Sequence, residues 1–152
     1  MSDKNKGNLL VAVQFLLLAG LIFTPTMLVW PIQAAMDVVG VALLIPAGLL
    51  LVFAFRDLGG SLTANPVPKE DNRLVTTGVY QRIRHPIYTA ILILGVAQVL
   101  FAGVLPHVIF LIGLYFLFTY KAKWEEQLLN AQHPEYADYL KRTQRFFPRF
   151  WR

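Results

Sequence analysis

The sequence predicts an all-α, polytopic membrane protein with about four transmembrane helices in two hairpins, a cytoplasmic loop and an amphipathic C-terminal helix. Its 152 residues are 56% hydrophobic and only 15% charged, whereas soluble domains average about one quarter charged residues. The apolar residues form long stretches without Asp, Glu, Lys or Arg. All 14 Lys and Arg residues lie outside those stretches. This composition excludes a soluble enzyme, a disordered chain and a collagen-like chain.

The first two predicted spans lie near the N-terminus. Residues 7–36 carry no charged side chain, and about 20 apolar residues are enough for a helix to cross a bilayer. We expect a first span at about residues 9–30, retained in the protein because it is too long for a signal peptide. Asp37 precedes 18 uncharged residues, 38–55, which predict a second, minimal span.

The third uncharged stretch, residues 86–120, is too long for one span. A single helix of this length would measure about 52 Å, against a hydrocarbon core of about 30 Å. Gly103 and Pro106 are the residues expected to break it. The resulting spans are about 87–104 and 106–123, and residues 1–152 are expected to form a single membrane domain.

The positive charges predict the orientation of these spans. With the N-terminus in the cytoplasm, the inside segments 1–7, 56–85 and 121–152 contain every Lys and Arg. We therefore expect a multi-pass protein of the cell inner membrane with both termini cytoplasmic. The net charge of +5 then reflects topology and attraction to anionic lipid headgroups, so no nucleic-acid partner is expected. The chain has no cysteine, and neither a thiolate metal site nor any other metal site is expected.

The polar residues that could support chemistry lie in two cytoplasmic regions, 73–88 and 121–150. Residues 61–73 precede the first region and resemble a flexible or extended connector. His85 comes directly before Pro86, a favourable first residue for a helix, so an imidazole and free backbone N–H groups would meet at a helix N-terminus. That end favours anions, and Arg84 adds a permanent positive charge. The alternative is that Arg82 and Arg84 simply extend to lipid headgroups.

Two adjacent acids, Glu125 and Glu126, follow the fourth span. On a helix they point about 100° apart, so at least one should face protein. The alternative is that Glu125 pairs with Lys121 one turn away and Glu126 is solvated. Acids directly beneath an apolar bundle are costly unless partnered, and they tend to be functional.

The C-terminal tail predicts a short helix beginning at Pro134, followed by a basic aromatic end that contains Arg145, Phe150 and Trp151. This composition fits either an interfacial anchor or a roof over a cytosolic pocket. Arg145 is then either a headgroup ligand or a site residue. The helix would carry Tyr136, Tyr139 and Leu140.

Two polar residues stand out within or between the spans. Gln14 is expected to form a hydrogen bond with another helix, because buried polar side chains in spans usually find such partners. His107 is expected in an outside turn.

The C-terminal half contains four short motifs. They are Gly78-Val79-Tyr80, Arg84-His85-Pro86-Ile87-Tyr88, Glu125-Glu126-Gln127-Leu128-Leu129, and Tyr136 and Tyr139 with Arg145-Phe146-Phe147-Pro148. Over about residues 73–150, these motifs resemble the isoprenylcysteine carboxyl methyltransferase and phospholipid methyltransferase superfamily of integral membrane proteins. In that family, Arg-His-Pro-x-Tyr-x-Gly and Glu-Glu-x-x-Leu motifs build an S-adenosylmethionine pocket. Here Ala90 replaces the usual glycine.

The resemblance implies an S-adenosylmethionine-dependent methyltransferase that acts on a lipid-soluble or small apolar acceptor entering from the bilayer. The acceptor group would be an isoprenylcysteine-type carboxylate, a phospholipid amine or a thiol. Arg84 and Arg145 are the candidate catalytic residues, which would orient an anionic substrate or headgroup. The residues expected to bind the cofactor are Tyr80, His85, Pro86, Tyr88, Glu125, Glu126 and Leu129.

Methyl transfer needs positioning and electrostatic stabilisation rather than a covalent nucleophile, which fits the absence of cysteine. Two other functions stay open. One is a non-enzymatic small membrane scaffold or assembly factor. The other is a reductase of the related sterol-reductase membrane fold.

Overall fold

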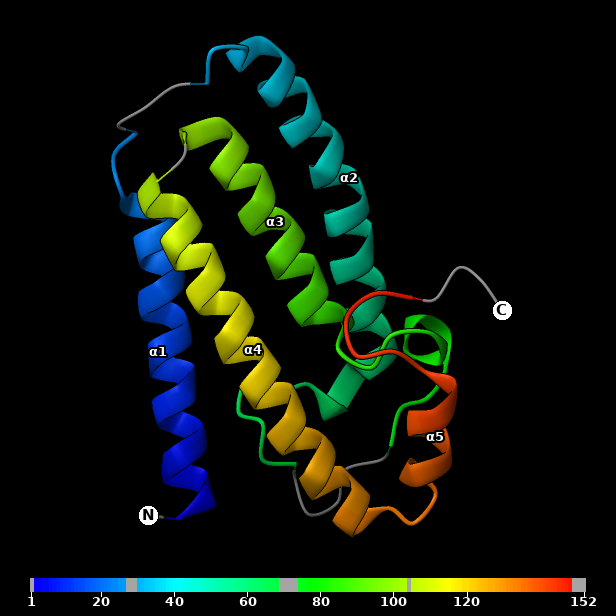
Figure 1. The fold of residues 1–152 in the computed structure, drawn as a ribbon. Helices are drawn as coiled ribbons and strands as arrows, with labels where there is room; N and C mark the ends of the chain where they lie inside the picture. The colour runs from blue at the N-terminus through cyan, green and yellow to red at the C-terminus, as the bar shows by residue number, and fades with distance from the viewer. Residues whose placement is uncertain (1, 27–29, 69–73, 104, 149–152) are drawn as a thin grey trace.

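The computed structural model describes residues 2–26, 30–68, 74–103 and 105–148, and within these residues the chain is helical without strands. The all-α prediction is therefore confirmed. The elements are α1 (Asp3–Phe23), α2 (Gln33–Leu58), α3 (Pro86–Ala102), α4 (Leu105–Gln132) and α5 (Tyr136–Arg142), with short 3-10 helices η1 (Gly59–Ser61) and η2 (Gly78–Gln81) (Figure 1).

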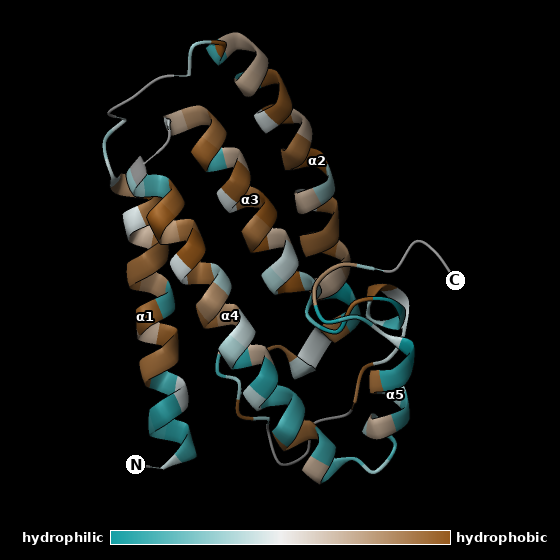
Figure 2. Ribbon diagram, viewed as in Figure 1, coloured by the Kyte–Doolittle hydropathy of each residue, from teal (hydrophilic) through white to brown (hydrophobic). Residues whose placement is uncertain are grey.

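Two helical segments, Asp3–Phe23 and Gln33–Ser61, are long and apolar enough to cross a membrane, and α3 is a shorter apolar helix. Hydrophobic residues cover the upper part of α1 to α4, whereas hydrophilic residues gather at the lower end with the connectors and α5 (Figure 2). Apolar helices that end in one polar region are typical of a membrane protein. The number of four spans stays a prediction.

The first two helices differ from the predicted spans at their ends. Helix α1 ends at Phe23 rather than near residue 30, because Pro25 disfavours helical backbone at the residue before it. The Thr24 hydroxyl donates to the Gly20 carbonyl at 2.6 Å and closes the last turn. Helix α2 extends beyond 38–55 in both directions. Residues 27–29 of the first predicted span lie outside the described residues.

The predicted break in the third apolar stretch is confirmed. Helix α3 ends at Ala102, and Gly103 has a φ of 84°, a conformation that favours glycine. Helix α4 then begins at Leu105, with Pro106 in its first turn. It continues to Gln132, beyond the predicted end at residue 123, and so carries both glutamates below the apolar part of the bundle.

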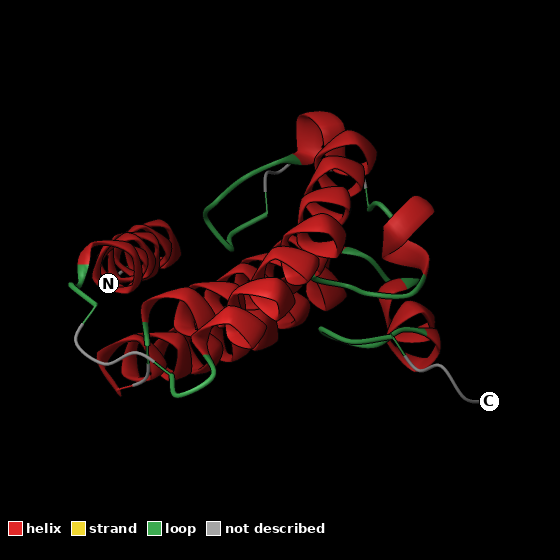
Figure 3. Ribbon diagram, turned by 90° about the horizontal axis from the view of Figure 1, so that it is seen from above, coloured by secondary structure: helices red, strands yellow, loops and turns green. Residues whose placement is uncertain are grey.

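Helix α2 packs along α3 and α1 packs along α4, while α3 and α4 pack on each other (Figures 1 and 3). The prediction of two hairpins is therefore wrong for the first pair, because α1 and α2 pack mainly on different partners. Small residues allow the close approaches: Phe110 lies against Gly20 of α1, and Phe101 lies against Gly40 of α2.

Two polar residues within the bundle were predicted with different success. Gln14 of α1 accepts a hydrogen bond from Lys121 Nζ of α4 at 2.6 Å, which confirms its helix–helix role. His107 is fully buried in α4, and its Nε2 lies 3.1 Å from the Thr24 carbonyl oxygen. Its prediction as an outside turn residue is wrong because α4 begins before it.

Candidate functional site

Two segments far apart in the sequence pair at the polar end of the bundle. The Arg84 backbone N–H donates to the Gln144 carbonyl at 2.9 Å, and the His85 N–H donates to the Arg145 carbonyl at 3.1 Å. Pro86 directly follows and begins α3. These bonds bind the C-terminal tail to the loop before α3, so residues predicted from both regions come together.

Glu126 is the centre of a buried charge cluster. Its Oε1 lies 2.9 Å from Arg84 Nε and 3.2 Å from His85 Nε2, and its Oε2 lies 2.6 Å from Arg145 Nη2. Burial alone would raise the pKa of Glu126, but hydrogen bonds from His85, Arg145 and Arg84 hold it far below its usual range. The alternative of a solvated Glu126 is therefore wrong.

Arg84 is held from a second direction as well. Its Nη1 donates to the Thr143 carbonyl and hydroxyl, at the end of α5, and to the Leu140 carbonyl at 3.4 Å. The Arg84 side chain is only 10% exposed. The alternative that it extends to lipid headgroups is wrong, since its donors are occupied within the protein.

Glu125 lies on the neighbouring face of α4 and contacts a different set of groups. The Tyr88 hydroxyl donates to Glu125 Oε2 at 3.4 Å, and His85 Nδ1 lies 3.7 Å from the same oxygen. The His85 and Tyr88 rings stack with centroids 5.4 Å apart. Burial raises the pKa of Glu125, although the nearby His85 and Lys121 oppose this shift.

Lys121 adopts a role that the sequence did not indicate. Its Nζ donates to Gln14 Oε1 at 2.6 Å and to the Ala64 carbonyl at 3.1 Å. It lies 5.4 Å from the Tyr88 ring centroid. Lys121 therefore joins α1 to the connector after η1, and its Nζ makes no direct ion pair with Glu125 among the described residues, although its charge acts on the pKa of Glu125.

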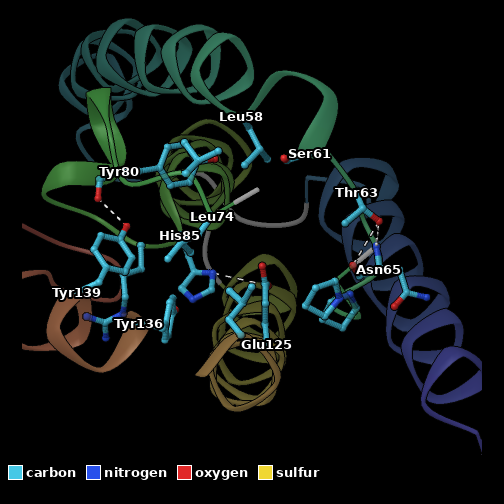
Figure 4. A pocket seen from close by; sticks show the side chains of 15 residues that line it. Leu58, Ser61, Thr63, Asn65, Leu74, Tyr80, His85, Glu125, Tyr136 and Tyr139 are labelled. Atoms are coloured by element: carbon cyan, nitrogen blue, oxygen red, sulfur yellow. Dashed lines mark hydrogen bonds and ion pairs between the residues drawn. The ribbon is translucent and has the colours of Figure 1, made fainter. Parts of the chain in front are cut away.

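Two cavities of different character share part of their lining. The smaller, about 80 Å³, is bordered by the connector residues Thr63 and Asn65 on one side and by Tyr136 of α5 on the other (Figure 4). The larger, about 390 Å³, extends along apolar residues such as Phe55 and Ile91. This volume lies within the range of small-molecule sites, about 300–1,000 Å³. The residues common to both cavities are Leu58, Thr63, Tyr80, Arg84, His85 and Glu125.

Most of the predicted site residues reach these cavities. Leu129 lines the smaller one, and Pro86 and Tyr88 line the larger one. Glu126 and Arg145 pair with each other and line neither of the two cavities. Residues 73 and 149–150 of the predicted site regions, together with Trp151, lie outside the described residues. The predicted residues that line both cavities are Tyr80, Arg84, His85 and Glu125.

The predicted C-terminal helix begins at Tyr136 rather than Pro134. Its buried face, Tyr136 and Tyr139, borders the smaller cavity. Of the two alternatives for the tail, the described part therefore matches the roof over a pocket. The two tyrosines are three residues apart in the sequence, a spacing that places them on the same face of a helix.

Three contributors to the site were missed in the sequence. Thr63 and Asn65 belong to the segment that was interpreted only as a connector, yet they line the smaller cavity. Asp57 accepts a hydrogen bond from the Val79 N–H at 2.9 Å and so fixes η2, which carries Tyr80. The Val79 N–H, together with Arg56, holds the pKa of Asp57 below its usual range. No local sequence signal identifies contacts of this kind, because the partners are distant in the chain.

Comparison with known proteins adds an independent finding. The sequence pattern of the isoprenylcysteine carboxyl methyltransferase (ICMT) family matches residues 39–131, a region that contains His85 and both glutamates. The cobalt-zinc-cadmium resistance protein CzcN of Cupriavidus metallidurans is 36% identical over 85 residues, which is 53% of this chain and 38% of that protein. The nickel-cobalt-cadmium resistance protein NccN of Alcaligenes xylosoxydans xylosoxydans is 35% identical over the same shares.

A plant enzyme is similar over a comparable region. Protein-S-isoprenylcysteine O-methyltransferase B of Arabidopsis thaliana is 35% identical over 74 residues, which is 45% of this chain and 38% of the plant protein. The similarity to each of these relatives thus covers 38% of the relative's length.

Proposed function

Because the chain belongs to the isoprenylcysteine carboxyl methyltransferase family, we propose that it is an integral membrane methyltransferase that uses S-adenosylmethionine and acts on a lipid-soluble or small apolar acceptor. One observation carries this proposal: Tyr80, His85 and Glu125 line both a smaller cavity with mixed polar and apolar walls and a larger cavity that extends along apolar helices. Transfer from a polar cofactor to an apolar acceptor requires a shared wall of this kind.

The residues of the smaller cavity fit the chemistry of part of the cofactor, because a cavity of about 80 Å³ would hold only one end of the molecule. S-adenosylmethionine presents a carboxylate, an ammonium and ribose hydroxyls, and it supplies a methyl group activated by a sulfonium. Glu125 keeps 28% of its side chain accessible where it lines the cavities, so its carboxylate would accept bonds from the ammonium or the ribose. Tyr80 and Leu129 would contact the cofactor, and the stacked Tyr88 would hold His85 in place.

The larger cavity suits an apolar acceptor. Its walls include Phe55 of α2 and Ile87 and Ile91 of α3. A hydrocarbon chain entering from the bilayer would therefore stay in apolar surroundings. The reactive group would then lie near His85 and Pro86. Arg84 lines both cavities and would orient an anionic acceptor group, while Arg145 would act through Glu126. The acceptor group would be an isoprenylcysteine-type carboxylate, a phospholipid amine or a thiol.

We also propose that α1 to α4 are four spans in the cell inner membrane, with both termini in the cytoplasm. The chain has no cysteine, so single cysteines can report the topology directly. With a membrane-impermeant maleimide on intact cells, Ile32→Cys should be labelled, while Ser2→Cys and Gln127→Cys should be labelled only after the cells are opened. The reverse pattern would overturn the orientation.

Cofactor binding is the direct test of the function. Titration calorimetry of the purified protein should give saturable S-adenosylmethionine binding at about micromolar concentration. Glu125→Ala and His85→Ala should weaken it, while Lys123→Ala, at an exposed position on the same helix, should not. Absent binding, or equal effects of all three changes, would favour the scaffold instead. Binding of a reduced nicotinamide would favour the reductase.

The acceptor requires a separate measurement. Membrane extracts incubated with S-adenosylmethionine carrying an isotopically labelled methyl group, with and without the protein, should differ in labelled lipid-soluble products. Mass spectrometry of those products would identify the methylated atom.

A further inference from the structure

The hydroxyl of Tyr136 differs from those of the other tyrosines around the two cavities. The Tyr139 hydroxyl donates to the Tyr80 carbonyl at 2.6 Å, the Tyr88 hydroxyl donates to Glu125, and the Tyr80 hydroxyl donates to the Ala54 carbonyl at 3.5 Å. Within the described part of the chain, the Tyr136 hydroxyl has no hydrogen-bond partner. Tyr136 nevertheless lines the smaller cavity and is only 1% exposed.

A tyrosine hydroxyl on a cavity wall that bonds no protein group is free to donate a hydrogen bond to a ligand. The Tyr136 ring is held in place by edge-on packing against Tyr139, with centroids 5.5 Å apart, so the hydroxyl is fixed beside the cavity. Burial raises the pKa of Tyr136, and the negative charge of Glu126 raises it further, while the positive charge of Arg84 opposes this shift. The hydroxyl is therefore protonated at neutral pH and available as a donor.

The charges around Tyr136 indicate which ligand group it would meet. The cluster of Glu126 with Arg84 and Arg145 has one formal negative and two permanent positive charges. In Figure 4, Tyr136 and Glu125 lie to either side of His85. A zwitterionic ligand would therefore place its ammonium toward Glu125 and its carboxylate toward Tyr136.

We propose that Tyr136 is a ligand-binding residue that donates a hydrogen bond to the carboxylate of S-adenosylmethionine. This inference rests on the proposed function, and it adds a residue of α5, which lies beyond the region matched by the family pattern. It also gives the tail a direct role in cofactor recognition.

Two ligands and two variants test the assignment by titration calorimetry. S-adenosylhomocysteine has the carboxylate, whereas S-adenosyl-3-thiopropylamine lacks only that group. Tyr136→Phe keeps the ring and should bind S-adenosylhomocysteine about tenfold more weakly, with unchanged affinity for the amine. Tyr120→Phe makes the same chemical change at a 48% exposed position and should leave both affinities unchanged.

Each result has a defined meaning. If wild type binds S-adenosylhomocysteine and Tyr136→Phe binds it equally well, the role of Tyr136 is overturned and the proposed function stands. Equal weakening of both ligands would overturn the carboxylate assignment. If wild type binds neither ligand, the proposed function itself fails.

A second measurement covers the case in which Tyr136→Phe does not fold. Protein with 3-fluorotyrosine at position 136 should show a fluorine NMR shift with S-adenosylhomocysteine and a smaller one with S-adenosyl-3-thiopropylamine. The absence of any shift on saturation with S-adenosylhomocysteine would overturn the proposal.

Discussion

The guanidinium of Arg145 lies against the carboxylate of Glu126, with Nη2 2.6 Å from Oε2 and Nε 3.1 Å from Oε1. Paired contacts of this kind match the fork of arginine better than the ammonium of lysine. The backbone carbonyl of Arg145 also accepts a hydrogen bond from the His85 N–H. One residue of the tail thus binds both the end of α4 and the loop before α3.

We predict that Glu126→Gln destabilises the protein by about 3 kcal/mol, because it leaves the charge of Arg84 buried without its partner. The midpoint of thermal unfolding in detergent would fall accordingly. Glu135→Gln is the matched control, since it removes the same charge from a side chain that is 65% exposed. Equal midpoints for the two variants would show that the cluster does not hold the tail.

The same carboxylate should make stability depend on pH. Hydrogen bonds hold the folded-state pKa of Glu126 below its ordinary value of 4.5. The ionised carboxylate therefore contributes fully to folding stability above pH 4.5, and this contribution is lost as the pH falls below 4.5. The difference in unfolding midpoint between wild type and Glu126→Gln should therefore shrink between pH 6 and pH 3. A constant difference across this range would contradict the prediction.

Gly78 should tolerate no side chain. Its φ is +60°, and a Cβ atom at this position would overlap the Asp57 carboxylate that binds the Val79 N–H. Gly78→Ala should cost about 2 kcal/mol and displace Tyr80 from the cavities, which would weaken cofactor binding. Gly48→Ala in α2 is the control, because apart from the adjacent residues and backbone of its own helix no atom lies within 4 Å of the added Cβ. Unchanged stability and cofactor affinity of Gly78→Ala would contradict this role.

The sequence predicted helix boundaries correctly where neighbouring residues in the chain determine them. Gly103 and Pro106 interrupt an apolar run, and α3 and α4 separate at that place. The packing of α1 on α4 depends on side chains from other helices, such as Phe110 against Gly20, and the hairpin prediction failed there.

The candidate site divides in the same way. His85 before a helix-starting proline was apparent from the sequence, whereas the cluster at Glu126 was not. Glu126 binds Arg84, 42 residues away, and Arg145, 19 residues away. Such partners become neighbours only when the tail pairs with the loop before α3. The sequence could therefore indicate that an acid would face protein without indicating which cation it meets.

We predict that the buried hydrogen bond between Lys121 and Gln14 stabilises the fold and holds the connector after η1 in place. Lys121 is fully buried and joins α1 to the Ala64 carbonyl in the connector that borders the larger cavity. Lys121→Met should lower the unfolding midpoint and increase hydrogen exchange of the backbone at residues 62–68, because the connector loses its attachment. Lys123→Met, at an exposed position one residue beyond Ala122, should change neither.

A double-mutant cycle separates this bond from a general loss of packing. If Lys121 and Gln14 act through their 2.6 Å bond, Gln14→Leu combined with Lys121→Met should cost less than the two single changes added together, by about 1 kcal/mol. Fully additive losses would mean that each side chain stabilises the bundle independently. In that case the connector would be held by the Ala64 contact alone, and Gln14→Leu would leave its hydrogen exchange unchanged.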